Sequence, residues 1–152
     1  SLISANNFTS EDFAMSHPSG SLGRRLLTLV SSIMKSGKDI PMASRETLLI
    51  DSLLVMSEKA LGMVLIAENE KLIGIFTDGD LRRALESNID FQKLTIGDVM
   101  TKDCKSIEPQ EPALTAMQMM EKYSLNSLPV VDSSNNIVGA INMHTLIQAK
   151  LF

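Results

Sequence analysis

The sequence contains an internal repeat with a spacing of about 65 residues, and no other feature limits the possible folds as strongly. Corresponding positions carry identical or similar residues: Ile33-Met34 and Val99-Met100, Leu61 and Leu125, Gly74 and Gly139. A unit of roughly 55 residues buries too little apolar surface to be stable on its own. We therefore expect two units of one architecture that pack against each other.

The same succession of elements is predicted in both copies: an extended stretch, a helix, two strands and a second helix. In the first copy these elements are expected near Ile40-Pro41, over residues 47–59, 63–67 and 72–76, and from Leu81 onward. In the second copy they are expected near Ser106-Ile107 and over residues 113–122, 128–131, 137–141 and 144–150. The pattern indicates a mixed α/β (α+β) fold. The ten methionines lie mainly on these elements, where we expect them to fill gaps in the core.

Composition favours a soluble globular protein without nucleic-acid or membrane partners. Apolar residues make up 44% of the 152 residues, which is enough to fill a core. The net charge is −4 and Trp is absent, so attraction to nucleic acid or anionic lipid is not favoured. The single cysteine, Cys104, has no disulfide partner and no His or Cys companions at metal-binding spacing. We expect a small buried thiol, no metal site and a cytoplasmic protein.

Residues 74–85 join a predicted strand to a predicted helix, and two residues there are candidates for ligand binding. A helix N-terminus offers unpaired N–H groups and the positive end of its dipole to an anion such as a phosphate. Thr77 can offer its hydroxyl to that anion, and the Asp80 carboxylate can accept hydrogen bonds from two sugar hydroxyls, which indicates a nucleotide. The same residues fit a capping box, in which each side chain satisfies the other's backbone N–H. Both interpretations are open.

The two copies differ at this junction in a way that favours a ligand in the first. The second copy has Asn142 at the position of Thr77, which is still a good N-cap, but Thr145 at the position of Asp80. A cap can therefore form without the carboxylate. We expect one competent site and one degenerate or differently used site in each chain.

Basic residues near the junction are weaker candidates. Arg82 and Arg83 can form charge-assisted bonds with a phosphate, although a solvated helix face explains them equally well. His144 is expected at the exposed first turn of the last helix. The only other histidine, His17, belongs to a different segment, and neither has a sequence-evident nucleophile or metal ligand beside it. The sequence therefore does not indicate an enzyme that acts alone.

The tandem units resemble a pair of cystathionine beta-synthase (CBS) domains over about residues 30–151, and Gly74-x-x-Thr77-x-x-Asp80 matches the ribose-phosphate motif of that family. Residues 11–27, followed later by residues 74–83, resemble the carboxy-terminal portion of bacterial arabinose-5-phosphate isomerases. Those enzymes join an amino-terminal sugar isomerase (SIS) domain to a CBS pair.

This resemblance implies a domain organisation. Residues 1–29 would be the tail of a SIS domain with its linker, residues 30–88 a first CBS domain and residues 89–152 a second. The two CBS domains would pack as a pseudo-twofold pair.

The resemblance also implies a chemistry. Arabinose-5-phosphate isomerases interconvert ribulose 5-phosphate and arabinose 5-phosphate for synthesis of the lipopolysaccharide sugar Kdo. Their catalytic SIS domain would lie before Ser1, so we expect this chain to be inactive alone. His17 matches a histidine of the family that is implicated in catalysis at the SIS active site. By the family pattern, a nucleotide base would lie near Ile40 and Met63.

Two roles are consistent with this family. In the first, the pair senses an adenine nucleotide (AMP or ATP) or the nucleotide sugar CMP-Kdo and passes that state to the SIS domain. In the second, it is a ligand-free assembly module that holds the enzyme together as a homodimer of CBS pairs and a homotetramer of full chains. Replacing Asp80 would abolish ligand binding under the first role and cost only a cap, about 1 kcal/mol, under the second. No cofactor is implied.

Overall fold

Two antiparallel hairpins, one from each repeat, form the centre of the fold. The structure is a computed structural model and describes residues 27–150. Its elements in chain order are α3 (Val30–Ile33), the 3-10 helix η2 (Gly37–Asp39), β1 (Met42–Ala43), α4 (Leu49–Lys59), β2 (Met63–Glu68), β3 (Lys71–Thr77), α5 (Asp78–Glu86), α6 (Ile96–Val99), α7 (Ala113–Lys122), β4 (Ser127–Val131), β5 (Ile137–Asn142) and α8 (Met143–Gln148). Strand β1 joins β2 in parallel, so the sheets are β1-β2-β3 and β4-β5.

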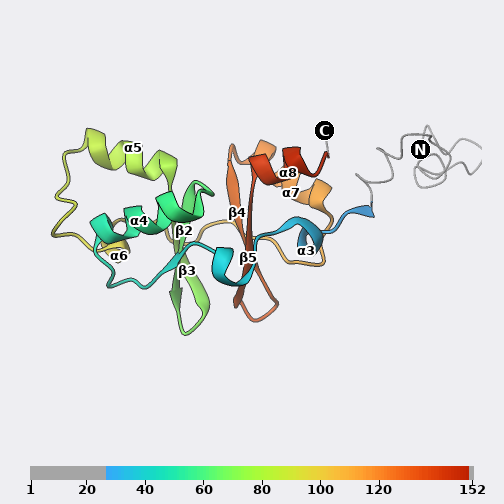
Figure 1. Cartoon of the computed structure of the whole chain (residues 1–152), viewed down its shortest axis with the longest axis horizontal. Helices are drawn as coiled ribbons and strands as arrows, with labels where there is room; N and C mark the ends of the chain where they lie inside the picture. The colour runs from blue at the N-terminus through green and yellow to red at the C-terminus, as the bar shows by residue number, and fades with distance from the viewer. Residues whose placement is uncertain (1–26, 151–152) are drawn as a thin grey trace, which may run out of the picture.

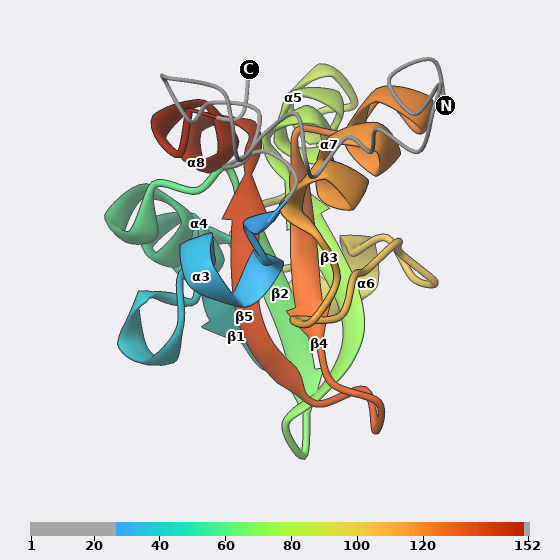
Figure 2. The ribbon, with the colours of Figure 1, turned by 90° about the vertical axis from the view of Figure 1, so that its right-hand side faces the viewer.

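Helices cover each hairpin, and the two halves lie side by side (Figure 1). Helices α4, α5 and α6 contact β2 and β3, whereas α3, α7 and α8 contact β4 and β5. Figure 2 shows both hairpin tips at one end of the molecule and α5, α7 and α8 at the other. Within residues 27–150, every helix is too short or too polar to cross a lipid bilayer.

The predicted mixed α/β class is confirmed, and most elements begin and end within two residues of the prediction. Helix α4 shows why: its buried residues Leu49, Ser52 and Met56 recur along one face at the helical period. Strand β4 is buried along its whole length, which explains its continuous rather than alternating apolar pattern. Helix α5 is an exception, because it begins at Asp78 rather than at the predicted Leu81.

The two shortest α-helices, α3 and α6, pack in the half of the molecule that belongs mainly to the other repeat. Val30 of α3 precedes the first repeat, yet it is fully buried in a core cluster with Ala113 and Leu146 of the second. Ile96 of α6 begins the second repeat and is fully buried with Leu49 and Phe76 of the first. The segment at the start of each repeat therefore belongs to the core of the other half, which would not be so in a chain of two independent units.

Backbone pairing accompanies this exchange. Lys35 bridges Ala140 of β5, and Thr101 bridges Ile75 of β3, so each crossing segment lies along the hairpin of the opposite half. The close approach depends on glycine. A Cβ atom added to Gly139 would contact Met34 Sδ and would lie 2.9 Å from the Lys35 carbonyl oxygen.

We expect Gly139→Ala to lower the free energy of unfolding by about 1–3 kcal/mol, because the new methyl group would push against the Lys35 backbone. Urea denaturation of the two proteins measures the difference. Gly37→Ala is the contrasting variant, since a Cβ there has nothing within 4 Å and only the positive φ of 58° opposes it. A Gly139→Ala protein as stable as the parent would show that α3 does not lie against β5.

The tips of the two hairpins are also joined. The backbone N–H of Leu72 donates to the carbonyl of Asn135 at 3.1 Å, and the N–H of Ile137 donates to the carbonyl of Glu70 at 2.9 Å. These bonds connect the halves at one end of the molecule. A cavity lies at the opposite end, where β3 and β5 end.

Candidate functional site

A cavity of about 850 Å³ lies between the two halves, where β3 and β5 end and where α5 and α8 begin. Both repeats and the segment between them line it, through side chains that include Thr77, Asp80, Arg83, Cys104, Asn126 and His144. This volume is within the usual range of small-molecule sites. The sequence motif thus opens into a space large enough for a nucleotide.

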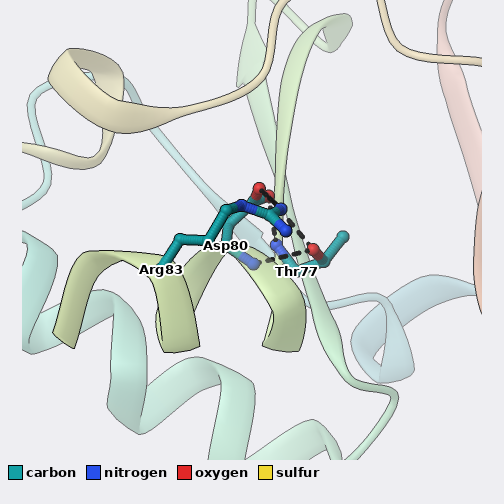
Figure 3. Close-up of polar contacts among 3 residues, drawn as sticks. All are labelled: Thr77, Asp80 and Arg83. Carbon is teal, nitrogen blue, oxygen red and sulfur yellow. Dashed lines mark hydrogen bonds and ion pairs between the residues drawn. The ribbon is translucent and has the colours of Figure 1, made fainter. Parts of the chain in front are cut away.

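Thr77 and Asp80 form a complete capping box at the start of α5 (Figure 3). The backbone N–H of Thr77 donates to Asp80 Oδ2 at 2.9 Å, and the Thr77 hydroxyl donates to the same oxygen at 3.1 Å. In return, the backbone N–H of Asp80 donates to Thr77 Oγ1 at 3.3 Å. Capping, one of the two interpretations of the motif, is therefore present, and it occupies one carboxylate oxygen.

The second carboxylate oxygen pairs with Arg83. Arg83 Nη2 donates to Asp80 Oδ1 at 2.6 Å, and Figure 3 shows the guanidinium folded back over the first turn of α5. The Asp80 side chain is 14% exposed and the Arg83 side chain 69%. The structure thus brings Thr77, Asp80 and Arg83 together at the wall of the cavity.

The equivalent junction of the second repeat is a simpler cap. Asn142 Oδ1 accepts from the backbone N–H of Thr145 at 2.8 Å and from its hydroxyl at 2.7 Å. Asn142 also donates to the Leu61 carbonyl in the other half at 3.3 Å. His144 is exposed in the first turn of α8, as expected from the sequence, and lines the cavity. Among the described residues of this junction, Thr145 takes the position of Asp80, so there is no equivalent carboxylate.

Two apolar candidates lie behind the cavity wall. Ile40 and Met63 are 7% and 0% exposed and belong to a core cluster with Leu61 and Ile75. Leu61 and Ile75 line the cavity, and the first two are not among its lining residues. Ile40 and Met63 therefore belong to the apolar cluster beside the cavity, but other members of that cluster reach its surface. Their contact with a ligand remains a prediction.

The segment between the repeats contributes residues that the sequence analysis did not connect with the site. Cys104 is only half-buried and lines the cavity, whereas the sequence led us to expect a buried thiol; partial burial raises its pKa. Lys105 Nζ lies 4.4 Å from the ring centroid of Tyr123, at cation–π distance, and both residues line the cavity. No periodic pattern or motif marks these positions, so no signal in the sequence could have found them.

The charged side chains around the cavity balance each other. Three are basic and three acidic: Arg82, Arg83 and Lys105, and Asp78, Asp80 and Asp103. The start of α5 adds the partial positive charge of its helix dipole. Among residues 27–150, no group of three or more His, Cys, Asp and Glu side chains is placed to hold a metal ion. His17 lies outside the described residues.

Three curated relatives of this chain carry the same name. An arabinose 5-phosphate isomerase KdsD from Francisella tularensis is 47% identical over 150 residues, which are 99% of this chain and 46% of the relative. The enzymes of the same name from Pseudomonas aeruginosa and Escherichia coli K12 are 47% and 42% identical over 97% of this chain. The chain spans somewhat less than half the length of these relatives.

Solved structures resemble the fold. The CBS domain pair of protein MJ0100, in complex with 5′-methylthioadenosine and S-adenosyl-L-methionine, has a TM-score of 0.71 and 25% identity over 80% of this chain and 94% of that one. CBSX2 in complex with AMP has a TM-score of 0.69 and 21% identity, with 82% and 96% covered. The family model of the CBS domain matches residues 30–87 and 96–151. With two matching segments, the chain belongs to the CBS-domain family and carries a tandem pair of these domains.

Proposed function

We propose that the cavity binds a nucleotide or nucleotide sugar and that the chain is the regulatory part of an arabinose-5-phosphate isomerase. The observation that carries this proposal is the convergence of Thr77, Asp80 and Arg83 on a cavity of about 850 Å³ between the repeats. In this arrangement the start of α5 faces the phosphate, and Asp80 accepts hydrogen bonds from the ribose hydroxyls. The base lies against the apolar cluster that contains Leu61 and Ile75.

The ligand class is supported by the named complexes of similar folds. MJ0100 was solved with adenosine derivatives and CBSX2 with AMP. An adenine nucleotide is therefore the first candidate for this chain, and the pathway's activated sugar, CMP-Kdo, is the second. A regulatory ligand must bind two arrangements of the enzyme with different affinity, because equal affinity changes nothing.

The name that these relatives share supports the activity proposed for the full-length enzyme. The SIS domain of the same enzyme would catalyse the interconversion of ribulose 5-phosphate and arabinose 5-phosphate in the cytoplasm, with His17 near its active site. The 42–47% identity covers nearly all of this chain, so the resemblance includes the stretch around His17 as well as the CBS pair.

A second candidate role is assembly without a ligand, in a homodimer of CBS pairs or a homotetramer of full chains. Its support is the exposure of large apolar side chains on the outer helices. Leu54 of α4, Leu85 of α5 and Ile147 of α8 are 70%, 59% and 54% exposed. Burial of these side chains between copies would stabilise an oligomer.

We expect Asp80→Asn to abolish the rise in melting temperature that a bound nucleotide produces, because the amide can still cap α5 but presents no carboxylate to the ribose. The measurement is thermal unfolding with AMP, ADP, ATP, CMP and CMP-Kdo. Asp98→Asn is a closely matched control. Thr95 and Asp98 form the same capping box at α6, with the Thr95 N–H 2.9 Å from Asp98 Oδ2, and they lie outside the cavity.

Both variants remove one charge from a helix start, so both should lose a similar 0.3–1 kcal/mol of stability, about what a charge in this position contributes. Only Asp80→Asn should lose the response to the ligand. An unchanged response in Asp80→Asn would contradict the proposed site. If no nucleotide shifts the melting temperature of the parent chain, the assembly role becomes the conclusion.

A further inference from the structure

The Asp80 carboxylate has both of its oxygens engaged in the structure. Oδ2 accepts from the backbone and the hydroxyl of Thr77, and Oδ1 accepts from Arg83 at 2.6 Å. The capping bonds are local to α5 and stabilise the start of the helix. The bond to Arg83 joins two side chains, one of which is largely exposed. Oδ1 is therefore the oxygen that a ligand can reach, provided that it displaces the guanidinium.

The guanidinium also lies beside the first turn of α5, where an anion would bind. A Cβ atom added to Gly79 would lie 3.5 Å from Arg83 Nη2 and 3.6 Å from Nη1, so the guanidinium lies beside the space that a side chain at Gly79 would occupy. This turn carries the positive end of the helix dipole. Arg83 thus lies beside both the carboxylate proposed to bind the sugar and the turn proposed to bind the phosphate.

We infer that Arg83 makes the site selective for phosphorylated ligands over the corresponding nucleosides. This inference rests on the proposed function. A ligand whose sugar hydroxyls bind Asp80 Oδ1 breaks the ion pair and releases Arg83. A phosphate on the same ligand then receives the guanidinium in a charge-assisted bond, beside the N–H groups of α5. A nucleoside breaks the same ion pair and offers no anion in return.

The ion pair contributes little by itself, since one partner is exposed to solvent. Its displacement therefore lowers nucleoside affinity by a small factor only. The bond that replaces it in the nucleotide complex is stronger, because a phosphate monoester carries more negative charge than a carboxylate and the cavity is partly closed to water. Arg83 consequently has opposite effects on the two ligand types, which a residue with only a structural role would not have.

Titration calorimetry of the whole chain with AMP and adenosine, and with CMP and cytidine, tests this inference. We expect Arg83→Gln to weaken nucleotide binding about tenfold and to leave nucleoside binding unchanged or strengthened a few-fold. Arg83→Lys should recover part of the nucleotide affinity, because it keeps the charge. Arg45→Gln is the control: it removes a similar ion pair, with Arg45 Nη2 3.0 Å from Glu68 Oε1, at a surface away from the cavity.

Different results separate the two proposals. If the parent chain binds nucleotides and Arg83→Gln changes nucleotide and nucleoside affinity by the same factor, the selectivity inference is wrong and the nucleotide site stands. If the parent chain binds neither nucleotide, the proposed function fails, and the inference that rests on it fails too. An equal loss in Arg45→Gln would show that net charge, rather than the position of Arg83, determines affinity.

Discussion

Phe76→Ala should lower the free energy of unfolding by about 3–5 kcal/mol, the usual cost of removing a buried aromatic ring. Phe76 is the largest of the fully buried side chains, 1% exposed, in the core cluster that also contains Leu49 and Val64. It pairs with Val64 across β2 and β3 and directly precedes Thr77. A domain of this size has about 5–15 kcal/mol of stability in total, so the variant should lose a large share of it.

Urea denaturation followed by circular dichroism measures this loss. Leu54→Ala is the control for removing an apolar side chain from the same half, because Leu54 is 70% exposed and its replacement should change stability by less than about 0.5 kcal/mol. A loss below about 1 kcal/mol for Phe76→Ala would mean that β3 is not packed as described. Because the strand leads into the capping box, the variant should also weaken any ligand response.

Ile96→Ala should destabilise the protein by about 2–5 kcal/mol, although Ile96 lies in a four-residue helix between the two hairpins. From its place in the chain, Ile96 would be a linker or the beginning of the second repeat. In the structure Ile96 packs in the first half, where it is 0% exposed in the cluster of Leu49 and Phe76. An effect of this size in such a short helix arises only if the crossing segment is part of the core.

A double-mutant cycle can show in which half Ile96 is buried. Ile66 and Ile141 are both 0% exposed, but Ile66 shares the cluster of Ile96 and Ile141 belongs to the other cluster. Combined with Ile96→Ala, the mild change Ile66→Val should deviate from additivity by at least 0.5 kcal/mol, whereas Ile141→Val should add within about 0.3–0.5 kcal/mol. The reverse pattern would place α6 in the second half.

Local elements of this fold could be predicted because they depend on short-range patterns. Helix α7 begins at Ala113 and ends at Lys122, as its apolar spacing predicts, and the strands around both hairpin turns were found within one residue. The repeat itself indicated two similar halves. These are properties of the residues within each segment, so a single sequence contains them.

The exchange of α3 and α6 could not be predicted in the same way. Apolar periodicity shows that Val30 and Ile96 belong in a core, but it does not show which core. Ile33-Met34 and Val99-Met100 were recognised as equivalent, and the structure indeed gives them equivalent positions. The partners of each segment are set by contacts between residues far apart in the chain.

The candidate site was predicted in part. Thr77, Asp80 and Arg83 were named from the junction of strand and helix, and the structure places them together at the cavity. The sequence left capping and ligand binding open because the two need the same residues. The residues that the second repeat and the connecting segment add, such as Asn126 and Lys105, depend on how the halves pack.

The packing of α3 has a consequence for biosynthesis. Its partners are α7 and β5, and its Val30 is buried with Leu146 near the end of the described chain. On the ribosome, α3 is therefore made before any of the elements that cover it. A four-residue helix has no stability of its own in water. During translation α3 therefore stays unfolded until the last strand and helix have been synthesised. The first half of the protein does not contain the residues against which α3 packs.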